Sequence, residues 1–434
     1  MRLQTNWPER RRSGARKPDL ESLESRQLLS HAPVAALRHA VTHVREAAAE
    51  RLTHARSTAR ALAPQASPGS WSFAVIGDTR DPRFHPVGTP SEGEEHGGFL
   101  NGRYVSGYLG TMCRAIAKTE RVKFAIHTGD LVRGDLYVQN TFGQQFKQYA
   151  GAVQPLLKKG IDVIPVLGNH EDYFGGSAIV QPPYFPWVKA FRSLTQAKGS
   201  PVKISQIDEY EGQNFMFSYG GALFVGLNTY PTFQGHDNDS AGLSGSALDS
   251  LDRILKENQG KQLFVFGHAP LVSYATPTAA NLDQNLDAES ARADRDRLLR
   301  VMTEVARPLN DRAYYLTGHI HMYDRSLITT PDYGRRSYQV EQLLVGSGGA
   351  EAALASQVHK PHGTLAGSST KLKVDDEFLS TSSIVDPRPR LGLQADVSVG
   401  YAIVTVTGSN VKVVWKEYDP ATRTFVAKDS ASFG

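Results

Sequence analysis

The chain has 434 residues, 40% of them hydrophobic and 21% charged, which is typical of a soluble globular protein with a sizeable core. Its formal net charge of +4 is small for this length and argues against a nucleic-acid-binding surface. Cys113 is the only cysteine, which excludes an intrachain disulfide and a cage of thiolate ligands, and no apolar run is long enough for a transmembrane helix.

Residues 1–33 are basic and then polar, and we expect a disordered tail there. Within it, residues 23–29 (LESRQLL) resemble the LEPR-x-LL element found near the start of many exported bacterial proteins, with Ser25 where that element has proline. This resemblance implies an exported or cell-envelope protein. The alternative is a chance match in the tail of a cytoplasmic protein.

Residues 34–70 are predicted to form a helix and a linker. The part up to residue 63 is rich in Ala, Arg, Leu and Glu, with apolar residues at helical spacing, and Pro64 then opens the segment PQASPGS. The main domain is expected to span residues 71–434.

The first part of that domain alternates between apolar strand-like runs and helical patterns. We expect strands at residues 71–78 and 122–130 and before Asn169, and helices over 104–119 and 143–158. Such alternation predicts a layered α/β fold with right-handed crossovers.

Later segments predict further strands and helices. Gly220-Gly221 joins two strand patterns into a hairpin, helices are expected over 245–258 and 288–307, and a strand pair surrounds Gly408. Residues 352–395 have the composition of an irregular excursion.

Five apolar runs end in Asp, Asn or His, the residue types that bind metal ions. Strands of an α/β sheet present ligands at their carboxyl ends, so we expect these side chains to gather at one site. They are Asp78, Asp130, Asn169, His268, and the pair His319 and His321.

The chemistry of this set indicates transition metals. Carboxylate, amide and imidazole ligands suit Mn, Fe, Zn or Co better than Ca or Mg. Six ligands are too many for one metal ion with open positions, and they are about right for two ions that share a bridging carboxylate. Such a pair holds a phosphate group and activates a bridging water.

The motifs GDTR, GDLVR, GNHE, GHAP and GHIH follow one another in this order over about residues 73–326. This series resembles that of the calcineurin-like metallophosphoesterases. GHIHMYDRS, the later LLVGSGGAEA and the hairpin before His268 resemble the purple-acid-phosphatase-like branch. The resemblance implies a four-layer αββα sandwich of two mixed β-sheets, with a dimetal site at one sheet edge.

The same resemblance implies a role for each motif residue. Asp130 bridges both metal ions, and Asp78 and His321 bind the first ion. Asn169, His268 and His319 bind the second ion. His170 acts beside the phosphate as the general acid, or it is a buried histidine of the turn. Glu171 is expected to hydrogen-bond the turn.

Two arginines depart from the family pattern. Arg80 stands where most relatives have a histidine ligand, and Arg133 stands where the purple branch has tyrosine. We therefore expect weak binding of the first metal ion and no iron–tyrosinate centre. Both arginines are candidates for binding the substrate phosphate, and the alternative is that they pair with neighbouring acids.

The sequence thus predicts a metal-dependent phosphoesterase that acts on a phosphate monoester or diester. A catalytically inert surface or binding module of the same fold is the alternative, because a ligand of the first metal ion is missing. A hydrolase for another kind of ester is a third reading. The oligomeric state is left open.

Overall fold

The structure is a computed structural model, and all of the residues that it describes lie in the unit Pro64–Gly434. The predicted tail and the predicted helix over 34–63 lie outside the described part of the chain. The described residues are 69–81, 104–134, 142–172, 184–208, 210–230, 241–272, 286, 291–306, 312–330, 338–351, 363–366, 371–380, 384–385 and 396–434.

The first sheet has the strand order β17-β16-β15-β1-β2-β3, and β11 and β14 also pair with β15. Strands β1, β2 and β3 are parallel to one another, whereas β15 is antiparallel to β1, so the sheet is mixed. Its strands are β1 (Trp71–Ile76), β2 (Val122–His127), β3 (Asp162–Pro165), β11 (Gly348–Glu351), β14 (Ile384–Val385), β15 (Asp396–Thr407), β16 (Asn410–Asp419) and β17 (Thr424–Phe433).

The second sheet has the order β12-β13-β9-β10-β8-β7-β6-β5-β4. It is also mixed, because β6, β7, β8 and β10 run parallel and the outer strands pair antiparallel. Its strands are β4 (Ser205–Gln206), β5 (Phe215–Tyr219), β6 (Ala222–Gly226), β7 (Gln262–Phe266), β8 (Arg312–Thr317), β9 (Tyr323–Thr330), β10 (Tyr338–Val345), β12 (Gly363–Ala366) and β13 (Lys371–Ser380).

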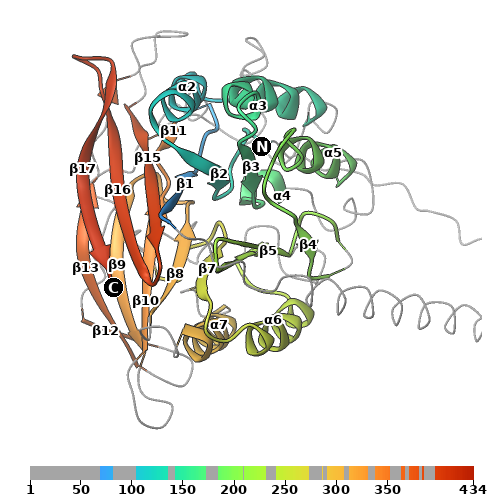
Figure 1. Ribbon diagram of the computed structural model, residues 1–434, viewed down its shortest axis with the longest axis vertical. Helices are drawn as coiled ribbons and strands as arrows, with labels where there is room; N and C mark the ends of the chain where they lie inside the picture. The colour runs from blue at the N-terminus through green and yellow to red at the C-terminus, as the bar shows by residue number, and fades with distance from the viewer. Residues whose placement is uncertain are drawn as a thin grey trace, which may run out of the picture. The chain divides into compact units, whose positions relative to one another are not determined.

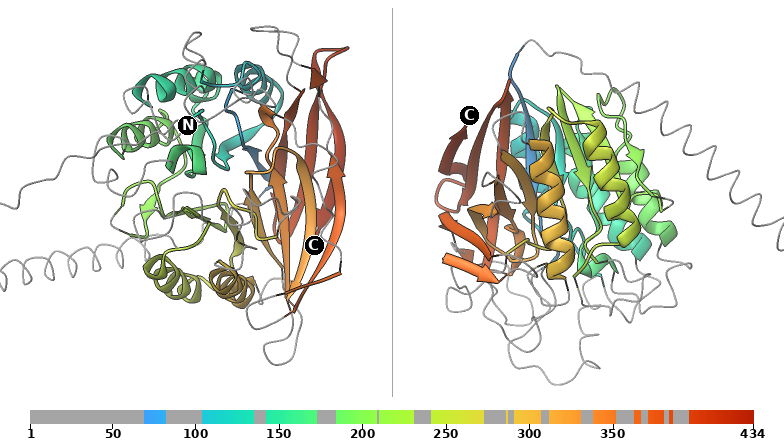
Figure 2. Two further views of the ribbon diagram at one scale, coloured as in Figure 1. Left: turned by 180° about the vertical axis from the view of Figure 1, so that it is seen from behind. Right: turned by 90° about the horizontal axis from the view of Figure 1, so that it is seen from below.

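Helices cover the outer face of each sheet. Helices α2 (Leu109–Thr119), α3 (Phe142–Leu157) and α5 (Tyr184–Leu194) pack together, and α3 and α5 contact β3. Helices α6 (Gly245–Glu257) and α7 (Arg292–Ala306) pack together on the other side, where α7 contacts β7, β8 and β10 (Figures 1 and 2). The order helix, sheet, sheet, helix confirms the predicted four-layer αββα sandwich.

The local sequence of α6 shows why it forms and how it packs. The Ser244 side chain caps the helix by accepting a hydrogen bond from the backbone N–H of Ala247. Leu248, Leu251 and Leu255 follow at spacings of three and four residues and are buried.

An aromatic layer joins the two sheets. Phe73 of β1 stacks on Phe124 of β2, with 5.4 Å between ring centroids. From the facing sheet, Phe224 and Phe264 present their rings edge-on to Phe73 at 5.3 and 5.2 Å. Aromatic pairs of this geometry add stability beyond the area that they bury, so the two sheets are held at a defined distance.

The predicted hairpin and strand pair are present. Gly220 and Gly221 link β5 to β6 with φ of 57° and 85°, values that suit the tight turn of a hairpin, and Gly408 has φ of 63° between β15 and β16. The stretch 352–395 differs from the expected irregular excursion, because it contains β12, β13 and β14. Strand β13 pairs with β9, and it buries Leu372 and Val374 on one face.

Candidate metal centre

The predicted ligands follow the carboxyl ends of five core strands. Asp78 comes after β1, Asp130 after β2, and Asn169 opens the short helix α4 (Asn169–Asp172) after β3. His268 comes after β7, and His319 and His321 come after β8. The first three strands belong to one sheet and the last two to the other, so the site lies where both sheets end.

One group of side chains converges on the amide oxygen of Asn169. His268 Nε2 lies 3.1 Å from Asn169 Oδ1 and 3.1 Å from Asp130 Oδ1, and His319 Nδ1 lies 3.3 Å from Asn169 Oδ1. Metal–ligand distances of about 2.1 Å place neighbouring ligands about 3.0–3.4 Å apart in octahedral or tetrahedral geometry. These side chains therefore fit one metal ion, and we call Asp130, Asn169, His268 and His319 the amide-side set.

The ring of His268 is held in the orientation that this set needs. Its Nδ1 lies 2.7 Å from the carbonyl oxygen of Thr128, to which it donates, so the Nε2 atom faces Asp130 and Asn169. A carbonyl that holds the far nitrogen is the usual support of a metal-binding histidine. Burial acts to lower the pKa of His268, but the Asp130 carboxylate raises it to about 9. The contact with Asp130 thus favours the protonated, positively charged form of the His268 imidazole.

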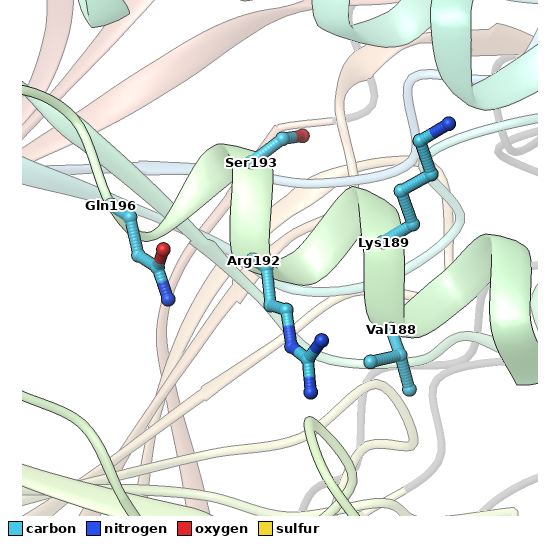
Figure 3. A pocket seen from close by; sticks show the side chains of 5 residues that line it. All are labelled: Val188, Lys189, Arg192, Ser193 and Gln196. Atoms are coloured by element: carbon cyan, nitrogen blue, oxygen red, sulfur yellow. The ribbon is translucent and has the colours of Figure 1, made fainter.

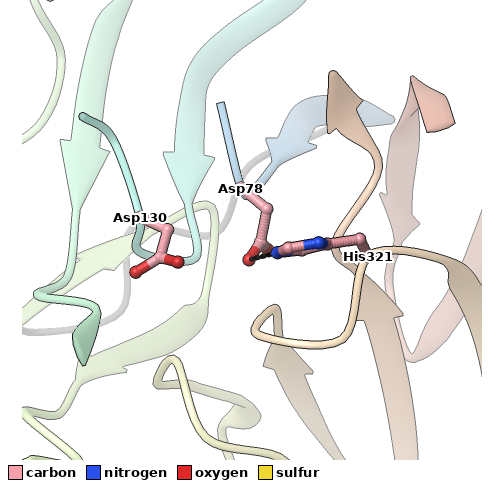
Figure 4. A group of neighbouring side chains, drawn as sticks. All are labelled: Asp78, Asp130 and His321. Carbon is pink, nitrogen blue, oxygen red and sulfur yellow. Dashed lines mark ion pairs between the residues drawn. The ribbon is translucent and has the colours of Figure 1, made fainter. Parts of the chain in front are cut away.

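A second group contains Asp78, Asp130 and His321. Each contributes one donor atom, and these atoms lie within 4.8 Å of one another. His321 Nε2 is 3.5 Å from Asp78 Oδ1, and the two side chains face each other in Figure 4 while Asp130 approaches from the loop after β2. These are the residues that the sequence assigned to the first metal ion.

Arg80 reaches into this second group. Its Nη2 lies 3.3 Å from His321 Nε2, and its Nε lies 3.5 Å from Asp130 Oδ2. The residue is 5% exposed. The sequence left two roles open for Arg80, binding of the substrate phosphate and pairing with a neighbouring acid. The structure shows the pairing, and the acid is Asp130.

Three ligand residues have backbone conformations that are uncommon for side-chain-bearing residues. Asp78, Asp130 and His319 have φ of 54°, 53° and 71°. Among the described residues, Arg423 is the only other non-glycine residue with positive φ. Such strain costs on the order of 1 kcal/mol or more per residue and is concentrated at functional sites. The positive φ turns the side chain of each of these three residues toward the cluster within three residues of the end of its strand.

Glycines of the motifs leave room for the carboxylates. A Cβ atom on Gly168 would lie 2.2 Å from Asp130 Oδ1, and one on Gly318 would lie 2.4 Å from Asp78 Oδ2. Any larger residue would displace the carboxylate. The glycines of GNHE and GHIH are thus explained by close approach rather than by turn conformation.

A family model described as calcineurin-like phosphoesterase matches residues 72–323. The chain belongs to this family. The match covers more than half of the chain and contains all of the candidate ligands, from Asp78 to His321.

Solved structures of low similarity also match the chain. "Structure of PhoD" is 15% identical with a TM-score of 0.49, over 86% of this chain and 70% of that chain. A single mutant of Vps29 from Entamoeba histolytica is 10% identical with a TM-score of 0.26, over 84% and 99% of the two chains. Vps29 from Chaetomium thermophilum is 9% identical with a TM-score of 0.23, over 84% and 96%. No curated protein matches the chain.

His170 lies beside the cluster. Its Nδ1 lies 2.6 Å from the carbonyl oxygen of Arg133, to which it donates, and its Nε2 lies 3.7 Å from Asp130 Oδ2. Burial lowers the pKa of His170 well below its usual value. Arg133 is buried as well, and its backbone carbonyl is the group that orients the His170 ring.

Glu171 supports the loops as expected from the sequence. Its two carboxylate oxygens accept hydrogen bonds from the backbone N–H groups of Asp130, Val132 and Gly168 at 3.0, 3.0 and 2.9 Å. Burial raises its pKa to about 8, and hydrogen bonds from the backbone oppose this rise. Glu171 thereby ties the GD loop after β2 to the GNHE turn.

Two supporting residues escaped the sequence reasoning. His127, the residue at the end of β2, lies with its Nε2 3.0 Å from Thr79 Oγ1 and is fully buried. The Tyr230 ring lies 5.8 Å from the His268 ring and 6.0 Å from the His319 ring. The available signal was a polar residue after a strand-like run. His127 directly precedes the TGD of KFAIHTGD, and Tyr230 ends the segment LNTY before a loop.

A surface pocket elsewhere shares no residue with this centre. It lies along α5 and is lined by Val188, Lys189, Arg192, Ser193 and Gln196 (Figure 3). Arg192 binds Glu211 through Nε and Nη2 at 2.7 and 2.5 Å.

Within the described part of the chain, no helix is long and apolar enough to cross a membrane.

Proposed function

We propose that this protein hydrolyses a phosphate ester with a metal ion bound by Asp130, Asn169, His268 and His319. The observation that carries the proposal is the convergence of two imidazole nitrogens on the amide oxygen of Asn169, at 3.1 and 3.3 Å, with the Asp130 carboxylate 3.1 Å from the nitrogen of His268. A metal ion there supplies Lewis acidity toward a phosphoryl oxygen and toward the attacking water. Mn, Fe, Zn and Co suit these ligands.

The residues around this set have separate roles in the proposal. His170 Nε2 points to the Asp130 side of the centre. Burial lowers the pKa of this ring and the Asp130 carboxylate raises it, and the negative charge of a bound phosphate ester would act in the same direction as Asp130, so that Nε2 can donate a proton to the leaving oxygen. The Arg133 carbonyl keeps the ring in that orientation. The guanidinium groups of Arg80 and Arg133 contribute positive charge toward a phosphate.

The test is hydrolysis of p-nitrophenyl phosphate and of bis-p-nitrophenyl phosphate, after chelation and addition of Mn, Zn, Fe or Co. We expect metal-dependent turnover that is lost in Asn169→Ala and retained in Asn258→Ala, a matched change at the end of α6. The ratio of the two rates assigns a monoesterase or a diesterase. A folded protein with no turnover and with tightly bound metal would instead favour the inert binding module.

We also propose that residues 71–434 form the phosphoesterase domain, preceded by a tail (1–33) and a helix with a linker (34–70). The likeness of residues 23–29 to an export element supports an exported or cell-envelope location. Fractionation of cells that produce the full chain tests the location. Limited proteolysis tests the boundary, with cleavage expected before Trp71 and activity retained in the remaining fragment.

A further inference from the structure

Arg80 contacts two of the residues that would hold a first metal ion. The Nη2 atom of Arg80 donates toward His321 Nε2 at 3.3 Å, and its Nε faces Asp130 Oδ2 at 3.5 Å. A neutral imidazole has one lone pair on its unprotonated nitrogen, so that nitrogen accepts a hydrogen bond or binds a metal ion, but not both. Arg80 and a metal ion therefore compete for the same position at His321.

The backbone on both sides of Arg80 is anchored. Arg80 forms an antiparallel bridge with Val105, the Ser106 N–H donates to the Thr79 carbonyl at 2.7 Å, and the Asp81 N–H donates to the Tyr104 carbonyl at 3.3 Å. With 5% of the residue exposed, the guanidinium is enclosed beside the carboxylates. A buried cation of this kind requires a fixed counter-charge, which Asp130 provides.

We propose that Arg80 takes the place of the first metal ion, so that each chain binds one metal ion, at the amide-side set. This inference rests on the proposed function. It replaces the expectation of a weakly bound first ion with a centre that combines one metal ion and one guanidinium. Asp78 and His321 then position Arg80 instead of binding metal.

The first experiment counts metal ions in the full chain and locates them. Chelated protein is titrated with Mn(II), desalted, and analysed for Mn content and by electron paramagnetic resonance, which separates isolated ions from a coupled pair. We expect one uncoupled ion per chain. His319→Ala should lose this ion, whereas His321→Ala, a change in the same GHIH motif, should keep it with less than about a threefold change in Kd.

The outcomes separate this inference from the proposed function. Two coupled ions in the unmodified protein, or loss of the single ion in His321→Ala, would overturn the role of Arg80 and leave metal-dependent hydrolysis standing. No bound Mn, and none after the same titration with Zn, Fe or Co, would overturn both.

A converse experiment supplies a ligand in place of the guanidinium. Arg80→His removes the charge and adds an imidazole next to Asp78 and His321, so we expect two ions per chain and a coupled spectrum. Arg133→His, an equally buried arginine, is the matched control and should bind one ion. A folded Arg80→His protein with one ion would contradict the proposal, and the metal counts of His319→Ala and His321→Ala decide it if Arg80→His fails to fold.

Discussion

Two charged clusters follow one another in this chain, and they differ in what their charges require. The first is the candidate metal centre. The second, which we call the Arg325 cluster, consists of the buried Tyr323, Arg325, Glu341 and Asp429 and the exposed Glu377, from β9, β10, β13 and β17. The segment GHIHMYDRS contributes to both, because His319 and His321 join the first and Tyr323 and Arg325 join the second.

The Arg325 cluster combines a guanidinium with carboxylates. Arg325 Nε and Nη2 contact the two oxygens of Asp429 at 3.0 and 3.3 Å, its Nη1 contacts Glu377 and lies 3.7 Å from Glu341, and Tyr323 donates to Asp429 at 2.9 Å. Each of these donors meets a carboxylate, and the contacts tie four strands together.

In the candidate metal centre, by contrast, imidazole nitrogens and side-chain oxygens converge on one another. The amide oxygen of Asn169 faces nitrogen atoms of His268 and His319, and Asp130 adds negative charge. Only a cation or a proton between these atoms satisfies all of them. The comparison shows that burial of charge alone does not mark a site; convergence of acceptors does.

The largest effect expected from this comparison is that of His268→Ala. Loss of an imidazole from the amide-side set should remove the metal ion and lower kcat/KM at least about 10³-fold, or about 4 kcal/mol. The free energy of unfolding of the chelated protein should change far less than activity. Steady-state kinetics and metal analysis test this prediction. Retained metal with full activity would show that His268 is not a ligand and would contradict the contrast between the two clusters.

Arg325→Leu should have the opposite profile. It leaves the Asp429 carboxylate buried without its cation, which costs about 3–5 kcal/mol of stability. Urea denaturation measures the loss. Lys373→Met, at the exposed pair Lys373–Asp375 of β13, is the control and should cost less than about 1 kcal/mol. Equal effects of the two variants would show that the Arg325 cluster is not a structural tie.

His170→Asn should lower kcat about 10²-fold on an alkyl phosphate ester, because general acid catalysis assists a poor leaving group. The loss should be several-fold smaller on p-nitrophenyl phosphate, whose leaving group needs little protonation. A ratio of losses near one would assign His170 to the turn. Bound metal should stay constant, which separates His170 from the ligands.

The smallest effect concerns the pH dependence of stability through Glu341. Burial raises the pKa of Glu341 to about 8, with a further rise from Glu377. The folded chain thus holds a proton that the unfolded chain releases above pH 4.5, so this contribution is present at low pH and is lost as pH rises toward 8. The expected loss of unfolding free energy is on the order of 2 kcal/mol, about half of the value that the full pKa shift of Glu341 would give.

Glu341→Gln keeps the shape of the protonated acid and does not titrate. Its free energy of unfolding should therefore be flatter between pH 5 and 8 than that of the unmodified protein, as measured by urea denaturation at each pH. If Glu341→Gln lost more stability relative to the unmodified protein at pH 8 than at pH 5, the predicted direction of the pH dependence would be wrong.

Much of the fold follows from local patterns. Apolar runs that end in Gly-Asp, Gly-Asn or Gly-His mark the core strands, because ligands lie at the carboxyl ends of strands, and at Gly168 and Gly318 only glycine allows a carboxylate to approach. The hairpin at Gly220-Gly221 is explained by positive φ at both turn residues. By contrast, β12, β13 and β14 were not predictable from the polar stretch 352–395, since outer strands depend on the partner that they pair with.

The family, the layered fold and the residues that gather at the candidate site could be predicted from the sequence, because these depend on strand periodicity and on short motifs. The contacts of each charged side chain at that site depend on the folded chain. Arg80 could be assigned to substrate or to an acid until its anchored backbone placed it between Asp130 and His321, which lie 50 and 241 positions further along the chain. Strand pairing likewise directs Arg325 to Asp429, with 104 positions between them. Electrostatic interactions act through space, so a charge has its meaning only from neighbours that folding brings to it.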